Sequence, residues 1–391
     1  MADMHAVVLV LALLDVNGYL SLRGIKATGT KTWLDEGWGR LDAGLDRTET
    51  IGDINAGIDY TPSQYFDLHA SGNIRHDPHG DVGGIIEAYA DARLPLGLDE
   101  LRLRAGQFFL PTSRENKDAN WASPYTITFS ALNSWIGQEV RPIGADLEYR
   151  HITAAGHTLT AAATAFQGND TMGTQLAWRG WSVGDRLTSY DEVLPLPRSA
   201  GRDASFPFQR KDGTKPFGTD LDGRTGYAGR FRYSVPERGN VQYTYVDNRG
   251  DRELYRGEYA WATKFHLIGA EIGDSAKLVL AAEYMRGKTG MGSPENKAWV
   301  DADVSAAYLL VSGKHGRNRL SARYDVFDTE ERDFSPAEID TESGRSWTAT
   351  WMFELRDDLR IAAEVTWFHG DRPPTPDPDA RSVTVEARYG F

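Results

Sequence analysis

Charged residues of this chain recur at every second position, and this spacing limits the chemistry that they support. Arg102 and Arg104 are spaced in this way, and so are Asp301 and Asp303. In an extended strand, side chains two residues apart point to the same side. Such pairs present fixed charge to one face of a sheet, where they attract or repel ions and orient polar molecules.

The motifs that would give these charges a catalytic role do not occur in the sequence. It has no His-Glu-x-x-His motif, no Gly-x-Ser-x-Gly turn and no Gly-x-x-x-x-Gly-Lys loop. The segment from Asp301 begins like a calcium loop, but Ala306 and Ser312 occupy the positions that need Gly and Glu. We interpret His76 and His79, the closest useful histidine pair, as solvated loop residues. We therefore predict no enzymatic activity, no metal site and no cofactor.

Composition excludes further classes of protein. The 391 residues include 43 Lys and Arg against 56 Asp and Glu, a net charge of -13 at pH 7, so the basic face that nucleic-acid binding needs is not expected. There is no Cys, which excludes disulfides. The mean hydropathy of -0.48 is too polar for a bundle of membrane helices. The longest early apolar run, Ala6 to Leu14, has nine residues, whereas a spanning helix needs roughly 18.

The elements that carry the charges alternate between apolar and polar residues. This period of two runs from Phe66 to Arg75 and from Ile86 to Leu94, and it returns from Val300 to Leu310 and from Trp347 to Leu355. Many segments have ten or more residues, near the roughly 9 to 11 that a tilted strand needs to cross a bilayer, while strands of soluble proteins have about 5 or 6. We predict an all-β transmembrane antiparallel β-barrel, with a soluble sandwich as the alternative. The apolar faces, Tyr308 included, are assigned to lipid.

The connections alternate between short turns and longer loops, as a barrel with both ends in the periplasm requires. Counting from Gly37 gives 16 strands, and 18 stays open because residues 18–27 also read as a strand. We interpret residues 1–14 as a shortened signal-peptide-like segment, leave the placement of 15–36 open, and assign 37–391 to the barrel. The long connection 168–223 is assigned to an external loop because of its polar, Pro-rich stretch 186–215, with residues 175–183 as a possible part of the wall instead.

The last strand resembles the terminal strand of Gram-negative outer-membrane proteins. It alternates through Val383, Val385 and Ala387 and ends at Tyr389 and Phe391. The resemblance implies that Tyr389 and Phe391 form part of the signal read by the barrel-assembly machinery. It also implies export through the periplasm to the bacterial outer membrane.

A second resemblance covers roughly residues 84–150. The segment Leu101-Arg102-Leu103-Arg104-Ala105-Gly106-Gln107-Phe108-Phe109-Leu110-Pro111 precedes a long connection that ends at Glu139. This arrangement resembles the phosphate-selective porin superfamily. The resemblance implies sixteen strands and a long third loop, residues 110–139, folded into the lumen to narrow the pore. The repeated basic clusters of strongly anion-selective members are not found here.

Fixed charges on the inner wall and on this loop are the candidate functional residues. They are predicted to line the pore or its constriction: Arg102, Arg104, Arg114, Glu115, Lys117, Asp118, Arg150, Arg230, Arg232, Glu283, Asp301, Asp303 and Asp325.

These observations lead to one main functional hypothesis and two alternatives. The main hypothesis is a porin through which small hydrophilic solutes and ions diffuse passively, filtered by loop 110–139 and the lumen charges. The first alternative is a channel specific for anions such as phosphate, or for sugars stacked on Trp33, Trp38, Trp178 or Trp181. The second is a closed barrel that acts as a surface receptor, adhesin or anchor. Expected partners are outer-membrane lipid and lipopolysaccharide, the assembly machinery and, as in resembling porins, two further copies in a homotrimer.

Overall fold

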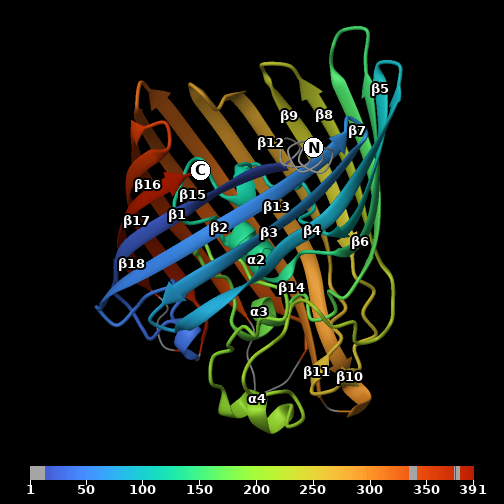
Figure 1. Ribbon diagram of the computed structural model, residues 1–391. Coiled ribbons are helices and arrows are strands. Elements are labelled where there is room, and N and C mark those ends of the chain that lie inside the picture. The colour runs from blue at the N-terminus through green and yellow to red at the C-terminus, as the bar shows by residue number, and fades with distance from the viewer. Residues whose placement is uncertain (1–13, 297, 334–340, 374, 376–378) are drawn as a thin grey trace, which may run out of the picture.

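Sixteen antiparallel strands close into one barrel in the computed structural model, which describes residues 14–391 except 297, 334–340, 374 and 376–378 (Figure 1). Each strand pairs with its neighbours in chain order, and the last pairs with the first. The strands of the wall are β1 (Leu14–Ala27), β2 (Thr48–Ser63), β3 (Phe66–Asp77), β4 (Gly80–Leu96), β5 (Asp99–Gln107), β6 (Ile143–Ile152), β7 (Thr158–Gln167), β8 (Gly226–Val235), β9 (Gly239–Asp247), β12 (Lys264–Asp274), β13 (Leu278–Ser293), β14 (Ala298–His315), β15 (Asn318–Glu331), β16 (Glu342–Arg356), β17 (Leu359–Asp371) and β18 (Ala380–Gly390).

The barrel closes through a strand that the sequence analysis left unplaced. β1 pairs with β18 from Tyr19 opposite Gly390 to Ala27 opposite Ser382, and its other edge pairs with β2. The prediction of sixteen strands is confirmed, but its first strand was wrong. Residues 37–47 belong to the β1–β2 loop, and the wall begins at Leu14. Residues 1–13, on which most of the signal-like segment falls, lie outside the described residues.

The alternation along each strand separates a lipid-type exterior from a polar interior. On β3, Leu68 and Ile74 are exposed on the outside, while Ser71 and Arg75 are buried inside. A closed sheet with an apolar exterior leaves no backbone edge unpaired in lipid, which is the requirement for a membrane barrel. No helix among the described residues has the length and hydropathy to span a membrane.

Two long loops occupy much of the interior. The β5–β6 loop carries η2 (Ala119–Trp121) and α2 (Ala131–Glu139), and the β7–β8 loop carries α3 (Thr174–Trp178) and α4 (Ala200–Ser205). Figure 1 shows α2 inside the barrel and α4 beyond the rim that bears the long loops. Every residue of α2 and α3 is buried. The remaining short elements lie in other connections: η1 (Trp33–Asp35), β10 (Leu254–Tyr255), β11 (Glu258–Tyr259) and η3 (Pro294–Asn296).

These loops reverse the predicted faces of β14. Val304 and Tyr308 are almost fully buried, and α2 packs against this strand. The alternate residues, including the exposed Leu309, point outward, and Asp301 and Asp303 belong to this outer set. Their assignment to the pore lining was therefore wrong, as was the assignment of Tyr308 to lipid. The apolar face of β14 turns inward because protein, not water, fills the lumen there.

The register predicts that a substitution to Arg destabilises the barrel on the outer face of the wall and is tolerated on the inner face. Ala90 lies on the outer face of β4, since it pairs with Leu68 and Ala105. Ala90→Arg should destabilise the folded barrel by about 2–4 kcal/mol, because it places a charge in the hydrocarbon. The folded fraction on unheated denaturing gels measures this loss.

Ala162→Arg on β7 is the matched control. Ala162 points inward between Glu148 and Arg230, so the same substitution should leave the folded fraction close to wild type. Equal losses from both variants would mean that the assignment of the faces is wrong.

Candidate functional site

The β5–β6 loop crosses the lumen and is held on its far side by carboxylates of the wall. Glu364 on β17 accepts hydrogen bonds from the backbone N–H groups of Ile127 (2.6 Å) and Thr128 (3.0 Å). Asp325 on β15 accepts from the N–H of Ala131 at the start of α2 (3.1 Å). Hydrogen bonds to ionised groups are the stronger class in proteins. The acidic residues of this wall therefore anchor the loop.

A buried ion pair fixes the centre of the same loop. Arg323 on β15 contacts the Glu115 carboxylate (2.6 Å) and donates to the backbone oxygens of Thr128 (2.6 Å) and Phe129 (2.8 Å). The Glu115 carboxylate also accepts from the N–H of Ser130 (2.8 Å), the residue that caps α2. A buried ion pair needs such additional hydrogen bonds to offset its desolvation. The loop is consequently a fixed part of the lumen, in agreement with the prediction that it folds inward.

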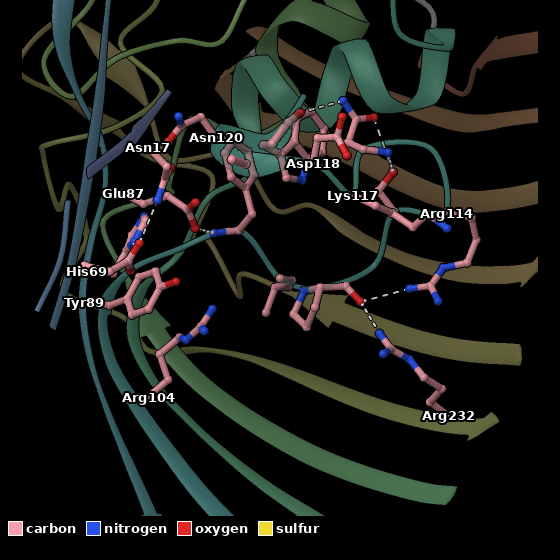
Figure 2. A pocket seen from close by; sticks show the side chains of 18 of the residues that line it. Asn17, His69, Glu87, Tyr89, Arg104, Arg114, Lys117, Asp118, Asn120 and Arg232 are labelled. Atoms are coloured by element: carbon pink, nitrogen blue, oxygen red, sulfur yellow. Dashed lines mark hydrogen bonds and ion pairs between the residues drawn. The ribbon is translucent and has the colours of Figure 1, made fainter. Parts of the chain in front are cut away.

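A cavity of about 580 Å³ lies between this loop and the wall on the short-turn side (Figure 2). Its walls come from β1 to β5, from β8, β9 and β12, and from loop residues around Pro111 to Trp121. We call this space the vestibule. Its ionisable residues include four cations and four carboxylates: Arg104, Arg114, Lys117, Arg232, Asp59, Glu87, Asp118 and Glu271.

The vestibule cations differ in their partners. The Arg104 guanidinium contacts the Asp91 carboxylate (2.9 Å), and Lys117 contacts Glu271 (2.5 Å). Arg232 instead donates to neutral oxygens, those of Gln242 (2.7 Å) and Pro111 (3.0 Å).

Arg114, on the same side of the cavity as Arg232, also has neutral acceptors, and it donates to the side chains of Asn240 and Gln242. Figure 2 shows Arg114 and Arg232 converging on one carbonyl, with Arg104 and Tyr89 across the cavity. The vestibule therefore presents positive charge on two opposed sides without an excess of cations over carboxylates.

The β7–β8 loop enters the barrel from the long-loop rim, as the β5–β6 loop does, and is held by a second charge cluster. Asp185 contacts Arg23 on β1 and, at 3.0 Å, Arg75 on β3. Burial alone would raise the pKa of the Asp185 carboxyl, but the two guanidinium groups lower it to about 2. Next to it, Arg186 contacts Asp77 on β3 (3.1 Å). We call this cluster the latch.

The two inward loops also contact each other. The Glu139 carboxylate at the end of α2 accepts from the N–H groups of Gly173 (3.1 Å) and Gln175 (3.0 Å). The N–H of Thr188 donates to the carbonyl of Gly137 (3.2 Å). The prediction that residues 168–223 form a loop is confirmed, but the first part of this loop lies inside the barrel and not outside it.

Most candidate residues lie inside the barrel. Arg104 and Arg232 line the vestibule, and Arg102 lies beside them, in contact with Asp91. Elsewhere on the inner wall, Arg230 pairs with Asp146 (2.9 Å) and Arg150 approaches Glu100 (3.9 Å). The loop residues Arg114, Glu115, Lys117 and Asp118 lie in the lumen, and Glu283 and Asp325 hold that loop. Asp301 and Asp303 are outside, as described above. Whether any of these residues selects solutes stays a prediction.

Asp185 and Arg186, the residues of the latch on the loop side, were not predicted as functional residues from the sequence. A signal for burial was present: Met172, Leu176 and Val183 are apolar residues in a segment taken to be external. Each is buried in the lumen. Trp33, Trp178 and Trp181 are buried as well, so they do not form an accessible platform for sugars.

Comparisons with known proteins agree with the barrel geometry. No protein-family model matches the sequence, and no curated protein matches it either. Among solved structures, the outer membrane channel DcaP of Acinetobacter baumannii aligns over 97% of both chains with a TM-score of 0.59 and 10% identity. The chain has the fold of the Gram-negative outer-membrane porins.

Two further outer-membrane protein structures cover as much of the chain. The anion-selective porin from Comamonas acidovorans aligns over 97% of this chain and 99% of its own with a TM-score of 0.52 and 9% identity. OmpT of Vibrio cholerae, in a trimer form, aligns over 97% and 99% with a TM-score of 0.52 and 11% identity. This fold and its apolar exterior place the barrel in the outer membrane.

The latch predicts that one side chain holds the β7–β8 loop in place. Asp185→Asn removes the carboxylate that Arg23 and Arg75 share, and because both guanidinium groups keep other carboxylates of the wall, the cost should stay below the roughly 3–5 kcal/mol of a buried charge left without a partner. The loop should become susceptible to limited proteolysis while the barrel stays folded. Asp203→Asn, an exposed change in the same loop, is the control and should leave the cleavage rate unchanged. Equal cleavage of both variants would contradict the latch.

The contact of Asp185 with Arg23 and Arg75 also predicts how the protease resistance of the β7–β8 loop depends on pH. Because the folded-state pKa of Asp185 is depressed to about 2, its stabilisation is fully present above the unfolded-state pKa near 4 and is lost as the pH falls toward 2. Protease resistance of the loop, measured with an acid-active protease, should therefore persist at pH 4 and above and decline between about pH 4 and 2. Loss of protection already at pH 5 to 6 would contradict this assignment.

Proposed function

We propose that this protein is an outer-membrane channel that lets small hydrophilic solutes diffuse passively and is not an enzyme. The observation that carries the proposal is the charged vestibule, formed where an inward loop narrows a sixteen-strand barrel. A barrel of this size is wide enough for an aqueous channel. Filtering then follows from diameter and from the fixed charges Arg104, Arg114, Lys117 and Arg232 facing Glu87 and Glu271.

The balance of charge favours a weakly selective pore over a strict anion channel. Four cations and four carboxylates line the vestibule, so its net field is small. A solute that carries both charges, or a strong dipole, fits opposed basic and acidic groups better than a simple anion does. A channel specific for phosphate stays the alternative, because the guanidinium groups of Arg114 and Arg232 donate to neutral oxygens and form no ion pair with a carboxylate in the described part of the chain.

A second candidate is a closed barrel that acts as a receptor or anchor. It is favoured by the β7–β8 loop, whose residues around α3 fill the long-loop half of the lumen. If the latch keeps this loop in place permanently, transport stops at the vestibule. Exposed parts of that loop, such as Phe208, would then form the receptor surface.

The proposal includes two kinds of protein partner, the barrel-assembly machinery and further copies of this chain. Phe391 is exposed on the outside and its backbone pairs with Gly18, which supports a terminal strand accessible to the assembly machinery before closure. A homotrimer is proposed because OmpT, which shares the fold, is described in a trimer form.

Single-channel recording in a planar bilayer under a salt gradient tests the channel. Wild-type protein should give stable open steps with weak selectivity. Arg104→Gln should shift the reversal potential toward cation preference and Glu271→Gln toward anion preference. Each anion-to-cation permeability ratio should change by up to about fivefold, since a unit charge about 4 Å away contributes about 1 kcal/mol in water.

Lys211→Gln, at an exposed loop position, is the control and should leave selectivity unchanged. If the folded wild type shows no conductance and Asp185→Asn restores it, the closed-barrel candidate is favoured instead. No conductance from either protein would reject the channel. Strong anion selectivity with block by phosphate would favour the phosphate-specific alternative.

A further inference from the structure

A groove of about 580 Å³ on the outer face of the barrel carries a cluster of basic residues. It runs across β9, β12, β13 and β14, and its lining includes Tyr243, Tyr245, Lys264, His266, Arg286 and Lys288. These residues point away from the lumen, because they alternate with buried inward residues such as Phe265 and Gly287. We call this feature the basic groove.

The basic groove lies directly beyond the apolar part of the exterior, toward the long loops. On β12 the outward residues change from the exposed Ile272 and Ile268 to His266 and Lys264, and on β13 they change from Leu280 and Tyr284 to Arg286 and Lys288. Aromatic residues such as Tyr243 and Tyr284 mark the boundary, as interfacial girdles do. The basic residues therefore lie at the level of the outer-leaflet headgroups.

The strand register brings like charges together. Lys264 lies directly opposite Lys288, and Arg286 lies two residues before Lys288 on the same face of the sheet. Like charges at directly opposed positions destabilise a sheet. The basic cluster therefore does not stabilise the pairing of these strands. A bound anion from outside the chain would offset the repulsion between its cations.

The carboxylates of this region leave that charge largely uncompensated. Asp303 contacts Lys288 (3.2 Å) and also Arg332 (2.9 Å), so it faces two cations. Asp247 lies opposite Lys264 in the register, but its carboxylate accepts from Tyr245 (3.1 Å) and the N–H of Arg249 (2.8 Å).

Two cations of the groove have no acidic partner. Within the described residues no carboxylate pairs with Lys264 or Arg286, whereas inward arginines such as Arg75 and Arg230 each pair with more than one.

From this arrangement we propose that the basic groove binds the phosphate groups of an anionic lipid of the outer leaflet, the lipid A part of lipopolysaccharide. The three cations Lys264, Arg286 and Lys288 surround the phosphates, and the exposed apolar residues beside them, such as Ile268, contact the acyl chains. This site is separate from the vestibule, so it holds whether the barrel conducts or is closed.

Native mass spectrometry of the folded full chain in detergent tests the proposal, because it reports bound lipid and oligomeric state together. The probe is lipid A with both phosphates, compared with the same lipid after removal of the phosphates. Each Lys or Arg near an anionic membrane surface contributes a factor of about 5. The triple variant Lys264→Gln, Arg286→Gln, Lys288→Gln should therefore bind the phosphorylated lipid on the order of a hundredfold more weakly than wild type.

Two control proteins keep the test specific. Lys211→Gln, Arg224→Gln, Arg238→Gln removes the same charge from exposed loop and turn positions and should bind as wild type does. Lys264→Arg, Lys288→Arg keeps the charge and should retain binding. A gel assay of heat-modifiable mobility confirms that each variant is folded.

Three results would overturn the proposal. The first is a triple Gln variant that binds the phosphorylated lipid as tightly as wild type does, and the second is wild type that binds the lipid without phosphates equally tightly. The third is dissociation of oligomers in the triple variant with unchanged lipid binding per chain, which would assign the groove to a contact between copies of this chain.

Discussion

The pairing of β1 with β18 is the contact on which the rest of the structure depends. In lipid every backbone N–H and C=O must be paired, so a sheet survives there only when its edges meet. Residues 14–27 supply the missing edge between β2 and β18. Once sixteen strands are closed, the lumen is too wide for wall side chains to fill. What enters this lumen then decides what the barrel does.

Two loops enter the lumen, and carboxylates form many of the contacts that hold them. Glu364 and Asp325 accept backbone N–H groups of the β5–β6 loop, and Asp185 joins the β7–β8 loop to Arg23 and Arg75. Charges assigned to a pore lining from the strands alone are thus divided into groups that anchor a loop and groups that border the vestibule. The vestibule holds an open space lined by charges of both signs, which is why the transport proposal rests there and not on the whole wall.

The exterior divides in a similar way. Most of it is apolar, but the strands β12 to β14 carry opposed cations just beyond the apolar part, together with Asp303. Inside the barrel, many basic side chains pair with carboxylates of the wall, as Arg230 on β8 pairs with Asp146 on β6. Outside, Lys264 and Arg286 have none among the described residues, and a membrane lipid is the nearest source of negative charge. The inner basic residues therefore pair mainly with carboxylates of the protein, whereas the outer ones are proposed to bind a membrane lipid.

The sequence by itself determined the class of fold, because a period of two over long segments admits few structures, and it located the inward loop between Arg104 and Arg150. It could not determine which face of a strand is the inside. Asp301 and Asp303 were assigned to the lumen because apolar residues were assigned to lipid, yet α2 buries the apolar face of β14 inside. Likewise, the role of Asp185 depends on Arg23 and Arg75, more than 100 residues away. Only the tertiary structure decides which face is inside and which distant residues meet. The periodicity of a strand shows that its two faces differ, but it does not show what packs against each face.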